Sequence, residues 1–255
     1  MISFTEAQLM AWISPILWPF LRVLAVFSVA PIFSSKAFPV RVRIGLAFLV
    51  AVASQASLPH QPTLNLEGQD LWATVSQQVG IGLAIGFVAR LVFASFELAG
   101  EVVGFQMGLN FATFFDPSMN TQSSAAARFF GYMASLLFVV LNGHLLVLMV
   151  VIQSFEAFPA NQNFLEAFSL MKLYSLGGEL FASGLWIALP MLGMLMFANL
   201  ALGVVSRVAP QMNIYAVGFP ITLTVGLVGM AATLPMLDRP FQMLMERLMD
   251  VFTGK

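Results

Sequence analysis

The chain has 255 residues, of which 59% are hydrophobic and 9% are charged, and its formal net charge at pH 7 is −1. Soluble domains carry roughly 25% charged residues, so this composition excludes a soluble protein and indicates an integral membrane protein. The near-zero net charge leaves no basic face for nucleic acid, and the absence of cysteine excludes disulfides, thiolate metal sites and cysteine nucleophiles.

Several apolar runs approach the roughly 20 residues that cross a bilayer as a helix, which predicts six helical segments. In chain order they cover residues 12–33, 44–59, 71–96, 129–155, 178–203 and 212–237. The second run is short for a full crossing, and prolines interrupt or flank others, at positions 15, 19, 31, 190, 220 and 235. Because proline removes a backbone donor and kinks a helix, we expect these segments to pack against protein in a multi-subunit assembly.

Loop charges predict the orientation of the chain in the membrane. Lys36, Arg41 and Arg43 follow the first run, whereas residues 60–70 include two acids and no Lys or Arg. Basic residues are enriched in cytoplasmic loops, so the N-terminus is expected outside and residues 207–213 inside.

No catalytic template is present. The chain lacks the common nucleotide, zinc-protease and serine-hydrolase motifs, and its only histidines are His60 and His144. No enzymatic activity, metal or cofactor is therefore expected. His144 lies in the middle of the fourth run, where it is either a hydrogen-bonded histidine inside the bundle or a proton-relay residue.

A charged stripe is predicted in the third run and the residues that follow it. Arg90, Glu97 and Glu101 are spaced by seven and four residues, which places them on one face of a continuous helix. A charge in the bilayer needs a partner or water. The stripe is thus expected either to form ion pairs that hold the packing or to line a lumen.

Glycines recur at four-residue spacing along the same segment. Small residues at this spacing let two helix backbones approach closely in lipid, so close helix packing is predicted there. The residues concerned are Gly82, Gly86, Gly100, Gly104 and Gly108.

The stretch GLNFATFFDPSMNTQ, from Gly108 to Gln122, is apolar but rich in residues that break helices. The residue before Pro117 is biased away from the helical region, and the polar residues that follow are weak helix formers. A loop at membrane depth, residues 106–122, is therefore predicted, either as a hydrophobic constriction in a pore or as a re-entrant packing loop. Its candidate gating residues are Met107, Phe111, Phe114, Phe115, Asp116, Pro117 and Met119.

Two other stretches, APIFSSKAFPVRVRIGLAF from Ala30 and SRVAPQMNIYAVGFPI from Ser206, carry a family resemblance. Together with FFDPSMN, they resemble the FliR family, the export-gate subunit of flagellar type III secretion, whose virulence-associated relatives are called SctT. The match covers essentially the whole chain. The residues that carry it are Pro31, Pro39, Arg41, Arg43, Arg207, Pro210, Gln211, Met212, Asn213, Gly218 and Pro220.

The resemblance implies an all-α integral membrane fold of kinked helical hairpins. Residues 1–175 would resemble FliP, and residues 176–255 would form a FliQ-like hairpin and the C-terminal tail. It further implies one copy of this chain in a hetero-oligomer with FliP- and FliQ-like subunits, beside an FlhB-like subunit, in the bacterial inner membrane at the flagellar basal body. Such a channel passes unfolded proteins, and the internal plug of the family would fall on the loop 106–122.

Other functions stay open on the residues themselves. A virulence secretion system would use the same kind of subunit. A small-solute transporter could use Arg90, Glu97, Glu101 and His144 as its coupling site, although the sequence shows no internal repeat. A purely structural subunit would make no contact with a pore.

Overall fold

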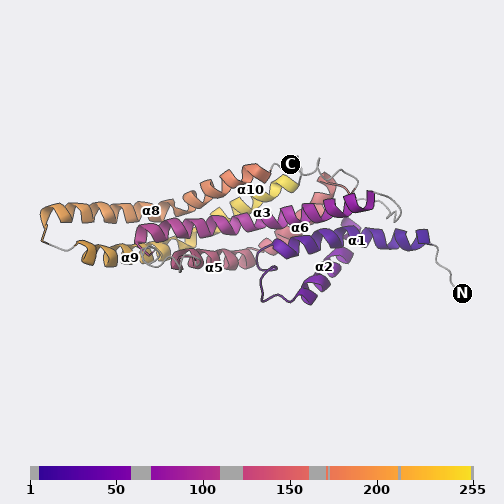
Figure 1. Cartoon of the computed structure of the whole chain (residues 1–255), viewed down its shortest axis with the longest axis horizontal. Coiled ribbons are helices and arrows are strands. Elements are labelled where there is room, and N and C mark those ends of the chain that lie inside the picture. Colours follow the sequence, from indigo (N-terminus) through magenta and orange to yellow (C-terminus); the bar gives the residue numbers. More distant parts are fainter. Residues whose placement is uncertain are drawn as a thin grey trace. The chain divides into compact units, whose positions relative to one another are not determined.

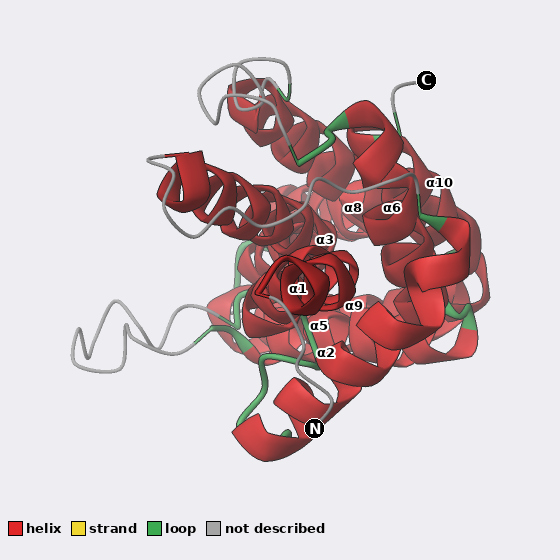
Figure 2. Cartoon of the chain, turned by 90° about the vertical axis from the view of Figure 1, so that its right-hand side faces the viewer, coloured by secondary structure: helices red, strands yellow, loops and turns green. Residues whose placement is uncertain are grey.

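A computed structural model describes residues 6–58, 70–109, 123–160, 171, 173–211 and 214–253. Every regular element in these ranges is a helix, as Figures 1 and 2 show. The α-helices are α1 (Glu6–Val29), α2 (Val40–Ser54), α3 (Asp70–Met107), α5 (Ala125–Val140), α6 (Gly143–Ala157), α8 (Leu176–Val208), α9 (Ile214–Thr233) and α10 (Asp238–Met249). Short 3-10 turns are η1 (Gln55–Ser57), η3 (Leu173–Ser175), η4 (Leu234–Met236) and η5 (Asp250–Phe252).

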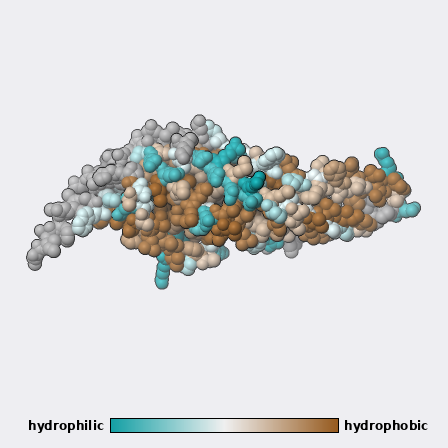
Figure 3. Space-filling model, turned by 180° about the vertical axis from the view of Figure 1, so that it is seen from behind, coloured by the Kyte–Doolittle hydropathy of each residue, from teal (hydrophilic) through white to brown (hydrophobic). Residues whose placement is uncertain are grey.

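The predicted all-α membrane fold is confirmed. Among the described residues, five helical segments are long and apolar enough to cross a membrane, and α5 with α6 forms a sixth candidate as a broken span. Two of the helices are longer than the apolar runs suggested, since α3 has 38 residues and α8 has 33. On the face shown in Figure 3, hydrophobic residues cover much of the surface.

The fourth apolar run, expected as one span, is interrupted between α5 and α6. Helix α5 ends at Val140, and Asn142 adopts a left-handed conformation with φ of 55° immediately before α6. Asparagine tolerates this conformation better than most side chains because its short amide can bond locally. His144 is consequently the second residue of α6, close to its N-terminus, rather than a residue in the middle of a span.

The chain divides into two compact units. Unit 1 comprises Met1–Leu91, Asn142–Gly177 and Met245–Lys255. In it, α1 packs against α2 and α6, and α6 packs against η5. Trp18 of α1, Phe155 of α6 and Ala160 form a buried cluster, with half-buried apolar residues of α1 and α3 around it.

Unit 2 comprises Val92–Leu141 and Gly178–Leu244. Its core is aromatic: the ring of Phe93 meets those of Phe138 and Phe241 edge to face, with centroids 5.6 and 6.2 Å apart, and Phe96 also meets Phe241. Helix α5 buries one face at four-residue spacing, with Phe130, Ala134 and Phe138. The regular spacing of these apolar residues explains why this segment is a helix that packs through one side.

Candidate functional site

Residues 106 and 107 of the candidate loop 106–122 belong to the last turn of α3 in the structure, and the last residue of the candidate loop lies just before α5 in the sequence. Both helix ends are in unit 2. The central residues of the loop, 110–122, lie outside the described residues, and so do the candidate gating residues Phe111, Phe114, Phe115, Asp116, Pro117 and Met119. The structure does describe the two ends from which this loop departs. Their contacts therefore define the candidate site.

The first end is a closed helix terminus. Gly108 has φ of 81°, a left-handed conformation that suits glycine because a Cβ would be strained there. Its N–H donates to the Phe105 carbonyl at 3.1 Å, and the Leu109 N–H donates to the Gly104 carbonyl at 3.0 Å. This pair of bonds is the Schellman arrangement, which satisfies the last carbonyls of a helix and stops α3 at Met107.

Met107 is anchored against α9. Its side chain is fully buried, and a Cβ added at Gly226 would lie 2.5 Å from both Met107 Cγ and Sδ. The Thr222 hydroxyl of α9 shares its single proton between the Met107 carbonyl at 3.3 Å and the Phe219 carbonyl of its own helix at 3.1 Å. The last turn of α3 is therefore held by both packing and a hydrogen bond at the point where the candidate loop begins.

The second end is held by Glu101. The Ser124 N–H donates to Glu101 Oε1 at 2.9 Å, while Ser124 Oγ caps α5 by accepting from the Ala127 N–H at 3.1 Å. A carboxylate is favourable here because the first N–H groups of a helix lack partners and carry partial positive charge. One residue of α3 thus ties the start of α5 to the helix that precedes the candidate loop.

The predicted charged stripe lies on the continuous helix α3. Arg90 and Glu97 are exposed and Glu101 is half-buried. A Cβ added at Gly131 of α5 would lie 3.2 Å from Glu97 Oε1, so both glutamates lie against α5. Whether the stripe lines a lumen in an assembly stays a prediction.

In unit 2, the predicted glycine row lies against the first turn of α5. A Cβ at Gly100 would come within 2.6 Å of Ala127 Cα and 2.7 Å of the Ala126 carbonyl oxygen. At Gly104, the nearest atom is the Ser124 hydroxyl oxygen, 3.1 Å away. Gly100 is therefore the position of closest backbone approach, because its neighbours are backbone atoms that no rotamer change can move.

In unit 1, Gly82 and Gly86 lie against α1, whereas the fifth glycine of the row, Gly108, follows the end of α3. A Cβ at Gly82 would collide with the Arg22 carbonyl oxygen and lie 2.7 Å from Ala25 Cβ. A Cβ at Gly86 would lie 2.9 Å from the Val26 carbonyl oxygen. The glycines of α3 thus serve two different neighbouring helices, α1 along one part and α5 along the other.

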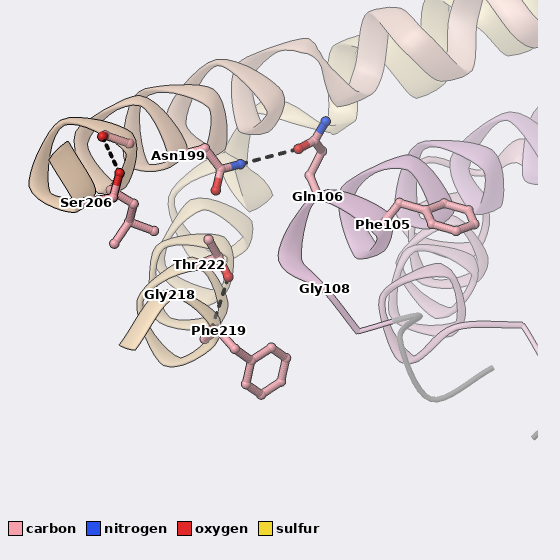
Figure 4. Close-up of a pocket in the computed structure, with 10 residues that line it drawn as sticks. Phe105, Gln106, Gly108, Asn199, Ser206, Gly218, Phe219 and Thr222 are labelled. Atoms are coloured by element: carbon pink, nitrogen blue, oxygen red, sulfur yellow. Dashed lines mark hydrogen bonds between the residues drawn. The ribbon is translucent and has the colours of Figure 1, made fainter. Parts of the chain in front are cut away.

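An open groove of about 680 Å³ lies between the end of α3, α8 and α9 (Figure 4). Gln106 at the end of α3 and Gly108 directly after it line one side, and Asn199 lines the groove from α8. Asn199 Nδ2 is 3.5 Å from Gln106 Oε1, and the large apolar residues along the groove are Phe105, Leu202 and Phe219. The groove therefore opens beside the residue from which the candidate loop departs.

Most residues of the family resemblance lie at helix ends or in the α8–α9 connection, and two of them, Gly218 and Pro220, lie inside α9. Pro39 is the N-cap of α2, and Arg41 and Arg43 lie in its first turn. Arg207 lies in the last turn of α8, where a cation complements the helix dipole. Pro31 follows α1, and Pro210 and Gln211 follow α8. Gly218 lines the groove, and Pro220 lies inside α9. Met212 and Asn213 lie outside the described residues.

One polar cluster escaped the sequence analysis. Arg22 of α1 is completely buried in unit 1, together with Gln78 of α3 and Ser154 of α6. A usable signal was present, because an arginine inside an apolar run has to be paired or shielded. The identity of its neighbours, however, depends on segments far away in the chain.

These features define a multi-pass helical membrane protein in which one long helix, α3, contacts the described residues on both sides of the segment 110–122. The chain belongs to the Bacterial export proteins, family 1, whose model matches residues 13–248. The resemblance to the FliR family is thereby confirmed.

Three relatives show the extent of the similarity. The chain is 40% identical over 237 residues to the Flagellar biosynthetic protein FliR of Escherichia coli (strain K12), which covers 93% of this chain and 90% of that protein. It is 38% identical over 257 residues to the protein of the same name from Pectobacterium carotovorum subsp. carotovorum, covering 99% and 98%. The Bacillus subtilis (strain 168) relative is 29% identical over 215 residues, covering 82% of each chain.

Proposed function

We propose that this chain is a core subunit of the flagellar type III protein export gate in the bacterial inner membrane. One copy would join FliP- and FliQ-like subunits, beside an FlhB-like subunit, to form a channel for unfolded flagellar proteins. The 40% identity to a flagellar biosynthetic protein over 93% of the chain is the observation that carries this proposal. The chain is proposed to be non-catalytic, with energy supplied by its partners.

The apolar helices are too long for a chain that is surrounded by lipid alone, and their length supports a multi-subunit assembly. The apolar segment Leu173–Val208 has 36 residues, and 22% of it is buried within the chain. As a helix it would be about 54 Å long, against roughly 30 Å of hydrocarbon. To fit, it would have to tilt by about 56°, which exceeds the roughly 40° upper range for membrane helices.

The exposed side chains along α8 are large and apolar over most of its length. They include Phe181, which is 62% exposed, and Val208, which is 79% exposed. Water cannot cover such a stripe favourably, and a bilayer is too thin to cover all of it. Apolar helices of other subunits are therefore the proposed cover for the part beyond the membrane.

The loop 106–122 is proposed to be the plug of this channel. Its support is the anchoring of both ends on α3, through the Schellman terminus at Gly108 and the bond from Ser124 to Glu101. The side chains of Phe111, Phe114 and Phe115 would form a hydrophobic constriction that excludes water and ions until the loop is displaced.

The first test is the native mass of the complex that is extracted in mild detergent from cells expressing this chain with its neighbouring membrane subunits. One copy held among several copies of two smaller hydrophobic proteins would support the export gate. A monomer or a symmetric homodimer would contradict it and would favour a solute transporter.

The second test is the ion conductance of the assembled complex in a planar bilayer after deletion of residues 111–117. Loss of the apolar constriction should raise the conductance. Substitution of the exposed Glu156 by Ala, on α6, provides a matched control that should leave it unchanged. Unchanged conductance in a deletion complex of normal mass would remove the plug assignment while leaving the export-gate assignment in place.

A further inference from the structure

The first membrane segment contains a charge that is withdrawn from both water and lipid. Arg22 lies in α1 and its relative exposure is 0%. Arginine keeps its charge in proteins, and a buried ion is costly unless its surroundings compensate it. The compensation has to come from the residues that unit 1 packs around the guanidinium.

Three guanidinium nitrogens donate to three different acceptors. Nε donates to Gln78 Oε1 of α3 at 2.9 Å, and Nη1 donates to Ser154 Oγ of α6 at 2.8 Å. Nη2 donates to the Phe158 carbonyl, directly after α6, also at 2.8 Å. All three acceptors are neutral oxygens, so these bonds satisfy the donors without supplying a full negative charge.

The C-terminal end of α6 provides the missing negative potential. Helix α6 ends at Ala157 with Phe158 as its C-cap, and the carbonyl end of a helix carries about half a negative elementary charge. The guanidinium carbon also lies 3.5 Å from the centroid of the Phe155 ring, whose face attracts cations. Ser154, Phe155 and Phe158 thus surround the cation from the last turn of one helix.

Local features of α3 position Gln78, the acceptor of the Arg22 Nε–H bond. Gly82 lets the backbones of α3 and α1 meet at Arg22, and Gln78 lies one turn earlier on the same face. The Gln78 amide donates to Gln77 Oε1 at 3.4 Å, and the Gln77 amide donates to the Pro159 carbonyl at 3.2 Å. The acceptor is therefore oriented by residues that also contact the segment after α6.

We propose that Arg22 is the positioning residue of unit 1, which sets the register of α1 against α3 and α6 with the C-terminal end of α6 as its counter-charge. A shift of α1 by one helical turn, about 5.4 Å, would break all three bonds at once. The planar guanidinium group of arginine is required because its N–H donors point in fixed directions, toward α3, α6 and the residue that follows α6. This role is independent of the proposed export function.

The test uses the absence of native cysteine, which allows a single introduced thiol to report on packing. Ala160 is 1% exposed and lies in the cluster with Trp18 and Phe155, so Ala160→Cys places the thiol beside the junction. The rate of its modification by a water-soluble maleimide is measured on the full chain in mild detergent. In the parent background this rate should be slow.

Arg22→Gln should raise the labelling rate at least tenfold, and Arg22→Lys should raise it similarly because an ammonium group cannot serve three separated acceptors. Arg239→Gln, which removes an exposed arginine from α10, is the matched control and should leave the rate unchanged. Parent-like labelling of Arg22→Gln would overturn the proposal. Labelling of Arg22→Lys as slow as that of the parent would overturn the requirement for a guanidinium group.

A milder variant guards against simple failure to fold. Ser154→Ala removes one acceptor and keeps the packing volume nearly unchanged, and circular dichroism checks that helix content is retained. Labelling of Ser154→Ala should rise severalfold, and the double variant with Arg22→Gln should label no faster than Arg22→Gln alone, because both changes remove the same bond. Effects that multiply would mean that the two residues act independently, which would also overturn the proposal.

Discussion

Substitution of Gly100 by Ala tests the closest approach of α3 to α5. The new Cβ would lie 2.6 Å from Ala127 Cα, about 0.8 Å inside the 3.4 Å at which ordinary van der Waals contact begins. Because the opposing atoms belong to the backbone, relief requires a shift of α5 itself. Overpacking of this kind costs up to about 3 kcal/mol. The better helix propensity of alanine stabilises the helix by about 1 kcal/mol, so the free energy of unfolding should fall by about 2 kcal/mol in total.

The assay is thermal unfolding of the full chain in mild detergent, followed by circular dichroism. A loss of about 2 kcal/mol should lower the midpoint by about 5 °C for a chain of this size. Gly193→Ala on α8 is the matched control, since a Cβ there meets no atom within 4 Å. It should gain about 1 kcal/mol from helix propensity alone. If both variants raise the midpoint equally, the close contact at Gly100 does not exist and the reasoning fails.

Substitutions at three further positions test the other contacts one by one. Gly226→Ala should cost less than about 1 kcal/mol in the same unfolding assay, because the atoms it meets belong to the flexible Met107 side chain. Asn142→Ala should lower the free energy of unfolding by about 1 kcal/mol, because alanine is strained in the left-handed conformation of this residue. Asn142→Gly should be at least as stable as the parent. Equal unfolding midpoints of the two variants would contradict the assigned conformation. Glu101→Ala should lower the free energy of unfolding by about 2 kcal/mol, because the Ser124 N–H loses its acceptor. Glu101→Gln keeps an acceptor for this N–H and should lower it clearly less. Equal losses in the two variants would refute the anchoring bond.

Some features of this protein are encoded locally and could be predicted. The apolar runs and the low charge established a multi-pass helical membrane protein, because bilayer thickness imposes segment length and composition directly. The stretch that begins at Gly108 was predicted to break the helix, and Gly108 follows the end of α3 in a left-handed conformation. The motif around Arg207 and Pro210 indicated the family that the comparisons confirm.

Other features depend on which segments meet, and that depends on tertiary packing. Glycine spacing predicted close contacts along α3, but only the structure shows that Gly82 lies against α1 and Gly100 against α5. The exact break of the fourth run at Asn142 was likewise hidden in a continuous apolar stretch.

Arg22 shows the same division most clearly. Its position in an apolar run reveals that a charge has to be compensated, because the cost of burying an ion is a property of the side chain and the medium. Its acceptors lie 56, 132 and 136 residues away, on Gln78, Ser154 and Phe158. Residues so distant in the chain become neighbours only when the helices pack. The sequence therefore determined that the charge needs partners, and the tertiary structure alone decided which atoms provide them.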